Sequence, residues 1–338
     1  MRTQGLTRVC GLMFAAALAI TVTGCPKEKP ADGGGGSGGG GGGVVGGDMT
    51  IAVMPKGTTH QFWKGVEAGA KQAGKEENVH IDWAGPANEN KIEDQVNLVE
   101  TKINAKVNGI VIAAIDATAL NRPLLNAKAK GIPVVTIDSG ITDKEASLSY
   151  IATDNVEGGR QAAITLAKAI GEKGKIGLLI FKKGSVSSDE RQKGFEEGIK
   201  KYPGIQLVTT LESNDPQQGT ESTINMLTAN PDIAGIFAAN EPNGVGAASA
   251  LKQKGLAGKV KLVAYDSSDE EVKAIQDGVI LATIVQDPYQ MGYKGVKTVL
   301  KAIRKQPITE KFINSGMTVV TKDNLNTPEV QKLLHPGQ

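Results

Sequence analysis

From residue 49 onward, short apolar runs alternate with longer stretches that have the period of an amphipathic helix. Apolar runs of this length are typical of buried parallel strands. The first series contains predicted strands at Thr50–Val53, Val79–Trp83, Gly109–Ala113, Pro133–Ile137 and Leu148–Ile151, with predicted helices at Gln61–Lys75, Asn90–Asn104 and Ala117–Lys130. The last of these helices runs into Gly131, a residue type that commonly ends a helix.

A second series of the same kind begins at Asp154. Its predicted helices are Val156–Ile170, Ser188–Lys200, Gln217–Ala229, Gly244–Lys254 and Asp269–Gln276, and its predicted strands are Lys175–Phe181, Ile205–Thr210, Gly235–Ala238, Lys261–Tyr265 and Ile280–Val285. Alternating β and α segments predict parallel sheets with right-handed crossovers. Two such series in a chain of 338 residues, which exceeds the usual size of one core, predict an α/β protein with two similar Rossmann-like lobes.

The first 48 residues have a different pattern. Residues 1–24 combine two basic residues, an apolar core from Gly11 to Val22 and no acid, which is typical of an export signal. Val22-Thr23-Gly24-Cys25 resembles the lipobox of bacterial lipoproteins, and this resemblance implies cleavage before Cys25 and lipidation of its sulfur. Residues 25–48 include the almost uninterrupted glycine run from Gly33 to Gly43, which predicts a flexible tether.

Charge and cysteine content exclude several classes of protein. The formal net charge is +2, and removal of Arg2 and Arg8 with the signal leaves equal numbers of basic and acidic residues. A neutral chain has no electrostatic basis for binding nucleic acid. Loss of Cys10 with the signal leaves Cys25 as the one cysteine of the processed chain, so no internal disulfide is expected.

Polar residues recur where the buried strands end. Asp138, Asn240 and Asp266 each follow an apolar strand, and Gln286 ends another before Asp287-Pro288. A single Asp in this position is usually a helix N-cap. Because ligands of open α/β sheets bind at the carboxyl ends of the strands, several such residues together indicate a polar ligand.

Two further segments carry candidate binding residues. Phe62 and Trp63 follow His60 at the start of the first helix, where they belong either to the core or to a cleft in which one ring faces the C–H side of a sugar. Ser187 and Glu190 have the spacing of a capping box, which places Arg191 in the first helical turn. A cation is disfavoured there by the helix dipole, which suggests that Arg191 binds hydroxyl or carboxylate oxygens.

The chain has no sequence motif of a catalytic or metal site. It contains no Gly-x-Ser-x-Gly, no His-Glu-x-x-His and no phosphate loop ending in Gly-Lys-Ser/Thr. None of the three histidines has a second ligand at metal-binding spacing. We therefore expect binding without catalysis, with no cofactor and no metal.

From about Thr50 to Lys322 the chain resembles the type I periplasmic sugar-binding proteins of ABC importers, most closely the ribose-binding branch. The segments that carry the resemblance are Asp138 after Val-Thr-Ile, residues 151–155 followed by Glu157-Gly158-Gly159, Glu190-Arg191 before Gly194-Phe195, residues 227–232, residues 237–240, Tyr265-Asp266 and residues 282–286. The resemblance implies two lobes joined by three crossovers near Thr153-Asp154, Gln286-Asp287 and Ser315-Gly316. It thus implies an N-terminal lobe of residues 49–153 plus 287–315 and a C-terminal lobe of residues 154–286 plus 316–338.

The resemblance also assigns a monosaccharide site. It implies ring stacking by Phe62 and Trp63, and hydrogen bonding by Asp138, Arg191, Asn240, Asp266 and Gln286. The chain departs from ribose binders at three positions, with Ser139 in place of an Arg, Asn214 in place of an aromatic residue and His60 in place of an Asn. These departures leave the sugar open between ribose and another pentose or hexose.

The expected protein is therefore a monomeric, exported lipoprotein, anchored at Cys25, that delivers a monosaccharide to an ABC permease. The alternatives are a sensory module that presents its sugar to a chemoreceptor or kinase, and a binder of a nucleoside or small furanose signal. A sugar-responsive repressor shares this fold, but the N-terminal region carries an export signal and a tether instead of a helix-turn-helix.

Overall fold

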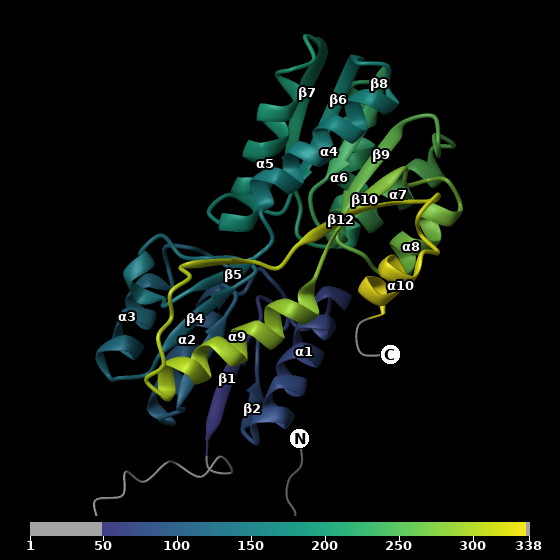
Figure 1. Ribbon diagram of the computed structural model, residues 1–338. Helices are drawn as coiled ribbons and strands as arrows, with labels where there is room; N and C mark the ends of the chain where they lie inside the picture. The colour runs from purple at the N-terminus through teal and green to yellow at the C-terminus, as the bar shows by residue number, and fades with distance from the viewer. Residues whose placement is uncertain (1–48, 336–338) are drawn as a thin grey trace, which may run out of the picture. The chain divides into compact units, whose positions relative to one another are not determined.

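The computed structural model describes residues 49–335, which form two six-stranded sheets covered by helices (Figure 1). The first sheet has the order β11-β5-β4-β3-β1-β2, and every pair in it is parallel. Its strands are β1 (Thr50–Met54), β2 (His80–Trp83), β3 (Gly109–Ile112), β4 (Val134–Ile137), β5 (Tyr150–Ala152) and β11 (Phe312–Asn314). The helices of this first lobe are α1 (Gln61–Glu77), α2 (Ile92–Asn104), α3 (Asn121–Ala129) and α9 (Pro288–Ile303), with a short 3-10 turn, η2 (Lys144–Ala146).

The second sheet has the order β12-β10-β9-β8-β6-β7. Its strands are β6 (Lys173–Ile180), β7 (Gly204–Glu212), β8 (Ile233–Ala238), β9 (Lys261–Tyr265), β10 (Ala282–Gln286) and β12 (Met317–Thr321). The helices of this second lobe are α4 (Asn155–Ala169), α5 (Val186–Ile199), α6 (Pro216–Ala229), α7 (Glu241–Gln253), α8 (Asp269–Gln276) and α10 (Pro328–Leu334). The prediction that the second sheet is parallel is wrong at one edge, where strand β12 runs antiparallel to β10.

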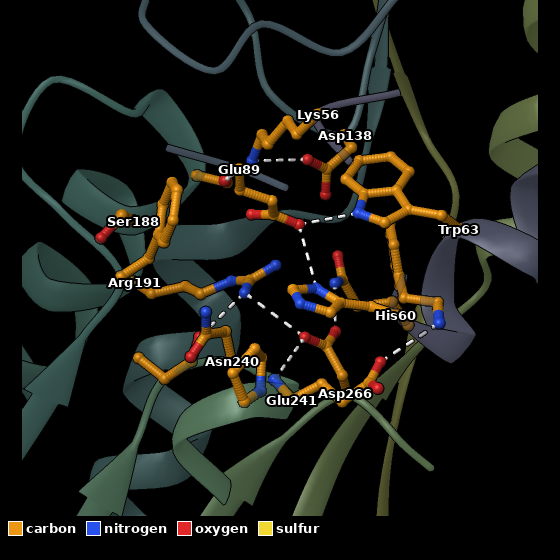
Figure 2. A pocket seen from close by; sticks show the side chains of 16 residues that line it. Lys56, His60, Trp63, Glu89, Asp138, Ser188, Arg191, Asn240, Glu241 and Asp266 are labelled. Carbon is orange, nitrogen blue, oxygen red and sulfur yellow. Dashed lines mark hydrogen bonds and ion pairs between the residues drawn. The ribbon is translucent and has the colours of Figure 1, made fainter. Parts of the chain in front are cut away.

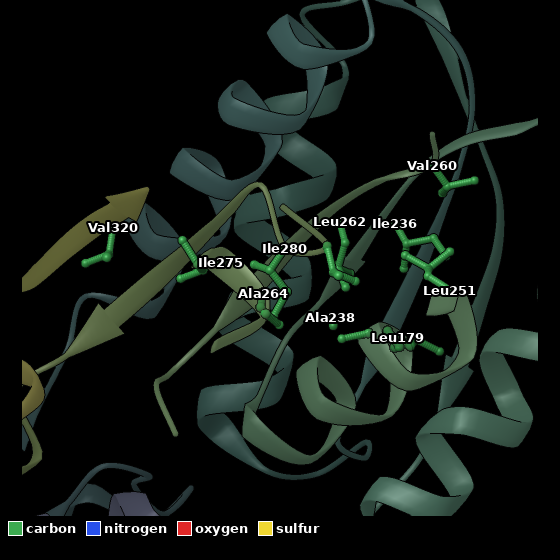
Figure 3. Close-up of a cluster of buried hydrophobic side chains, with 14 of the residues drawn as sticks. Leu179, Ile236, Ala238, Leu251, Val260, Leu262, Ala264, Ile275, Ile280 and Val320 are labelled. Carbon is green, nitrogen blue, oxygen red and sulfur yellow. The ribbon is translucent and has the colours of Figure 1, made fainter. Parts of the chain in front are cut away.

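Both sheets bury both faces, as the continuous apolar strands predicted. Side chains alternate along β1, where Val53 packs with α1 and α9 while Met54 packs with α2 and α3 on the opposite face. In the second lobe, the cluster in Figure 3 joins Leu179, Ile236 and Leu262 of the sheet to Leu251 of α7 and Ile275 of α8. The other face of that sheet packs against α4 and α5. The predicted α/β class with two similar lobes is confirmed.

The chain passes between the two sheets three times. After β5 of the first sheet it enters α4, which packs on the second sheet, and after β10 of the second sheet it enters α9, which packs on the first. The third passage joins β11 to β12 through Ser315 and Gly316, and Gly316 has a left-handed φ of 90°. Each lobe therefore contains a helix that follows a strand of the other lobe.

These exchanged helices approach their neighbours through glycine. A Cβ atom on Gly292 of α9 would lie 2.0 Å from the Val66 carbonyl oxygen of α1, and one on Gly159 of α4 would lie 2.1 Å from the Arg191 carbonyl oxygen of α5. No side chain fits at these distances. The two helix pairs thus depend on glycine at equivalent crossings in the two lobes.

The structure corrects several predicted boundaries. The sequence pattern did not predict α9, β11, β12 and α10, which lie beyond the second series of repeats. Helix α5 begins at Val186 instead of Ser188, and α7 begins at Glu241 instead of Gly244, because Asn240 caps α7 by accepting a hydrogen bond from the Asn243 amide. Within residues 49–335, no helix has the length and apolar character needed to cross a membrane.

The glycine crossing in the second lobe generates a stability prediction. Gly159→Ala should destabilise the protein by about 1–3 kcal/mol, because α4 and α5 must move apart to admit the methyl group. Gly140→Ala is the matched control, since its Cβ would meet the Tyr150 ring at an ordinary 3.7 Å. Urea unfolding of the two variants measures the difference, and equal midpoints would contradict the importance of the close crossing.

Candidate functional site

Two aspartates occupy equivalent positions at the carboxyl ends of the third strand from the β11 or β12 edge in each sheet. Asp138 follows β4 and Asp266 follows β9, and both have left-handed backbone φ angles, of 56° and 79°. The amide of Asp138 donates to the Ile151 carbonyl of β5 at 2.9 Å, and the amide of Asp266 donates to the Ile284 carbonyl of β10 at 2.9 Å. An Asp in this conformation is uncommon and is often found at functional sites.

The two aspartates line the same cavity (Figure 2). Eight of the ten candidate ligand-binding residues line it, namely His60, Phe62, Trp63, Asp138, Arg191, Asn240, Asp266 and Gln286. They come from loops and helix starts at the carboxyl ends of strands in both sheets. The fold therefore brings together residues that are far apart in the chain, among them the four predicted from the strand ends, Asp138, Asn240, Asp266 and Gln286.

Arg191 is held rigidly in the wall of the cavity. Its Nε donates to Asn155 Oδ1 at 2.9 Å and its Nη1 donates to the Ala239 carbonyl at 2.8 Å. The guanidinium lies 3.7 Å from the centre of the Tyr265 ring, and Nη1 lies 3.8 Å from Asp266 Oδ2. Stacking and fixed hydrogen bonds leave this cation pre-oriented toward the cavity.

Lys56 forms a second buried ion pair. Its Nζ lies 2.8 Å from Asp138 Oδ2 and donates to Ser187 Oγ on α5 at 3.0 Å. Only 4% of Lys56 is exposed, so its charge depends on this carboxylate partner. Lys56 belongs to the first lobe and Ser187 to the second, and the contact therefore spans the cavity.

Glu89 organises a third group at the cavity, made of Trp63 and His60. Its Oε1 accepts a hydrogen bond of 2.7 Å from the Trp63 indole and lies 3.2 Å from His60 Nδ1. Burial opposes ionisation of Glu89, but His60, Lys56 and Trp63 outweigh burial and lower its pKa. The edge-to-face contact of Phe62 with Trp63, with ring centres 4.8 Å apart, fixes the indole further.

The remaining acids at the cavity have raised pKa values. Burial raises the pKa of Asp266, against the opposing effects of Arg191 and of the hydrogen bond from Gln286 Nε2. Burial also raises the pKa of Glu241 to about 7, although His60 and two backbone amides oppose the shift. Asp266 and Glu241 are therefore the acids at this cavity for which burial favours the protonated form.

Two candidate residues do not line the cavity. Ser139 is fully buried, and its Oγ lies 3.4 Å from Ser185 Oγ of the second lobe. Asn214 follows β7, and its amide donates to Gln218 Oε1 at 3.3 Å. Both positions were inferred from where ribose binders place their ligand contacts, and the cavity is lined instead by other residues.

Two local predictions were wrong. Ser187 and Glu190 do not form a capping box, because α5 begins at Val186 and Ser187 lies inside its first turn. Arg191 consequently lies in the second turn, where the helix dipole hardly disfavours a cation. Its position in the helix is therefore not evidence for a binding role. Asp266 is not a helix cap either, since Ser268 caps α8 by accepting from the Glu271 amide.

Several residues that line the cavity were not predicted from the sequence, chiefly Lys56, Glu89, Phe181 and Glu241. Lys56 follows strand β1, so consistent use of the strand-end rule would have included it, whereas Phe181 follows β6 but is apolar and falls outside that rule. Glu89 lies in the loop between β2 and α2, where no local signal marks it. Among residues 49–335, no cluster of three or more His, Cys, Asp or Glu side chains is arranged to hold a metal ion.

Comparisons with known proteins agree with this architecture. Residues 51–307 match the periplasmic binding protein domain family. The D-allose-binding periplasmic protein of Escherichia coli K12 is 29% identical over 259 residues, covering 74% of this chain and 83% of that protein. The ribose import binding protein of the same strain is 32% identical over 203 residues, covering 60% and 68%.

Solved structures give the same result. An ABC transporter solute-binding protein from Agrobacterium vitis with bound D-fucose has a TM-score of 0.82 and 38% identity, covering 85% of this chain and all of that chain. A carbohydrate transporter solute-binding protein from Agrobacterium radiobacter, in complex with D-arabinose, has a TM-score of 0.81 and 34% identity, covering 85% and 99%.

The chain belongs to the periplasmic binding protein family. The resemblance to sugar-binding proteins of ABC importers is thereby confirmed, as is the expectation that the family binds solutes for transport and does not catalyse a reaction.

The Glu89 cluster generates a prediction about His60. Burial would lower the pKa of His60, but the hydrogen bond and charge of Glu89, together with the charges of Glu241 and Asp266, raise it above the ordinary value. The stabilisation from protonated His60 is therefore complete below the ordinary histidine range and is lost as the pH rises through the raised pKa. Glu89→Gln keeps an acceptor for Trp63 but removes the charge, and should lower the pKa of His60.

An NMR titration of the imidazole signals measures this change. His60→Asn assigns the His60 signal by its loss from the spectrum. An unchanged His60 titration in Glu89→Gln would show that Glu89 does not control its protonation.

Proposed function

We propose that this protein is the solute-binding lipoprotein of an ABC importer and holds one neutral monosaccharide in the cavity described above. The observation that carries the proposal is the convergence of carboxylates, amides, a stacked guanidinium and aromatic rings from both lobes on one cavity. Carboxylates and amides suit a sugar because each bridges adjacent hydroxyls, and a buried group left unmatched penalises the wrong epimer.

The proposed contacts rest on the chemistry of the residues that line the cavity. Phe62 and Trp63 offer ring faces and edges to the C–H groups of the sugar. Asp138 and Asp266 accept hydrogen bonds from hydroxyls, Arg191 donates to oxygens, and Asn240 and Gln286 supply amides. Ser139 and Asn214 lie outside the lining and are left out of this set.

The neutral character of the ligand follows from the balance of buried charge. Three acids at the cavity each have a basic partner within it, in the pairs Lys56–Asp138, His60–Glu89 and Arg191–Asp266. Glu241 is the remaining acid, and burial raises its pKa to about 7. A charged sugar would leave an unpaired charge in the cavity, which costs free energy.

The N-terminal region, which lies outside the described residues, completes the proposal. Residues 1–24 direct export and are removed, Cys25 carries the lipid, and residues 26–48 tether the folded part to the membrane. The processed protein acts as a monomer in the periplasm or at the cell surface and docks a permease. The relatives that act in import are described as periplasmic or import-binding proteins.

A thermal-shift screen tests the ligand class. We expect one of D-ribose, D-allose, D-arabinose, D-fucose or a related pentose or hexose to stabilise the protein by about 2.7 kcal/mol at 100 times its Kd, a shift of several degrees. Asp266→Asn should lose most of this shift, whereas Asp277→Asn, at the exposed end of α8, should keep it. A shift from nucleosides alone would replace the sugar with a furanose signal, and no shift from either class would refute the proposal.

Lipidation is tested separately by Cys25→Ser. The native protein should sediment with membranes and incorporate radiolabelled palmitate, because an acylated Cys25 anchors it. The variant should incorporate no label and should not be cut before residue 25. Equal labelling of both proteins would show that Cys25 is not the site of the lipid.

A further inference from the structure

Helix α1, which carries Phe62 and Trp63 into the cavity, has no cap of its own. The first amides of any α-helix lack partners within the helix. His60 occupies the N-cap position of α1 but makes no capping hydrogen bond, and the first turn contains no acidic residue. Two other helices that begin beside the cavity are capped by their own N-cap residues, α7 by Asn240 and α8 by Ser268.

The missing cap comes from the other lobe. Glu241 is the first residue of α7, and its Oε1 accepts from the Gln61 amide at 3.2 Å while its Oε2 accepts from the Phe62 amide at 3.2 Å. One carboxylate thus satisfies two free amides of α1, at the end of the helix where negative charge is favoured. Glu241 is 9% exposed, so water does not compete freely for these bonds.

A second contact reinforces the same junction. The Gln61 side-chain Nε2 donates to Asp269 Oδ1 at 3.2 Å, and the Asp269 amide donates back to Gln61 Oε1 at 3.2 Å. Asp269 is the first residue of α8, so the starts of two second-lobe helices both contact the start of α1.

Glu241 is also joined to the proposed sugar site. Its own amide donates to Asp266 Oδ2 at 3.1 Å. A ligand that orders Asp266 therefore also orders the first turn of α7, from which the Glu241 side chain reaches α1.

We propose that Glu241 is a positioning residue that caps α1 from the opposite lobe. Because the cap forms only when the lobes are in contact, closing of the lobes and ordering of the Phe62–Trp63 turn are one event. This inference takes one point from the proposed function, namely that the ligand is a monosaccharide. Separation of the lobes removes the cap, and the aromatic turn then frays. Affinity for the sugar thus depends on a residue whose role is to order the aromatic wall.

Amide hydrogen exchange measures the cap directly. In the full-length protein at pH 8, above the pKa of about 7 of Glu241, we expect Glu241→Gln to speed exchange of the Gln61 and Phe62 amides about tenfold. Glu270→Gln is the matched control, since Glu270 is an exposed first-turn acid of α8. Equal exchange in native protein and Glu241→Gln would overturn the proposal.

A proline substitution removes the donor instead of the acceptor. Gln61→Pro deletes one amide that Glu241 accepts from, and proline is well tolerated at the first position of a helix. His60 has φ −82° and ψ 148°, a conformation compatible with a following proline. Gln61→Ala keeps the amide but loses the Asp269 contact, so the difference between the two variants isolates the capping bond.

Binding of the sugar found in the thermal screen provides the second readout. Glu241→Gln should raise the Kd about tenfold in the native background and by a smaller factor in Gln61→Pro, because the two changes remove the same interaction. If Glu241→Gln raises the Kd by the same factor in both backgrounds, Glu241 acts on the sugar itself. If no sugar binds, the proposed function fails, while the exchange experiment on the sugar-free protein still decides the role of Glu241.

Discussion

Pairing of buried charges is the constraint on which the cavity depends. Lys56, Asp138, Arg191, Glu89 and Asp266 are each nine-tenths or more buried, and an isolated charge at such depth is costly. Each has an oppositely charged group beside it, and removal of one member of a buried pair typically costs about 3–5 kcal/mol. The pairs therefore hold these charged side chains in the orientations in which a ligand would meet them.

Both lobes contribute charged pairs to the site. Arg191 and Asp266 come from the second lobe, whereas Lys56, Asp138, His60 and Glu89 come from the first. Lys56 contacts Ser187 across the cavity, and Ser139 contacts Ser185 beside it. The polar groups of the cavity thus hold the lobes together as well as facing its interior.

Sequence alone was sufficient for the repeats and for most of the strand ends. The apolar runs located ten strands, and most of these are buried on both faces and therefore lack the polar alternation of a half-exposed strand. Asp138, Asn240, Asp266 and Gln286 were found because parallel strands all end at one edge of the sheet. Strands β11 and β12 were not predicted, since both are short and only partly buried.

The missed residues show where local reasoning fails. Glu89 has no signal in its own loop, and its role arises only when folding brings it to His60 and Trp63. The uncapped start of α1 was equally hidden, because its partner Glu241 lies far along the chain. The Ser187–Glu190 spacing matched a capping box, yet Ser187 contacts Lys56 of the other lobe instead. Contacts between distant segments override such short patterns.

The exchange of helices between lobes affects the order in which the lobes can fold during synthesis. The first lobe includes α9 and β11, which are made only after the whole second sheet except β12 has been synthesised. Until then Val53, Val111 and Ile137 lack the cover that α9 provides on their face of the sheet. A chain that emerges from its N-terminus therefore cannot complete either lobe until the segment from α9 to β12 has been made.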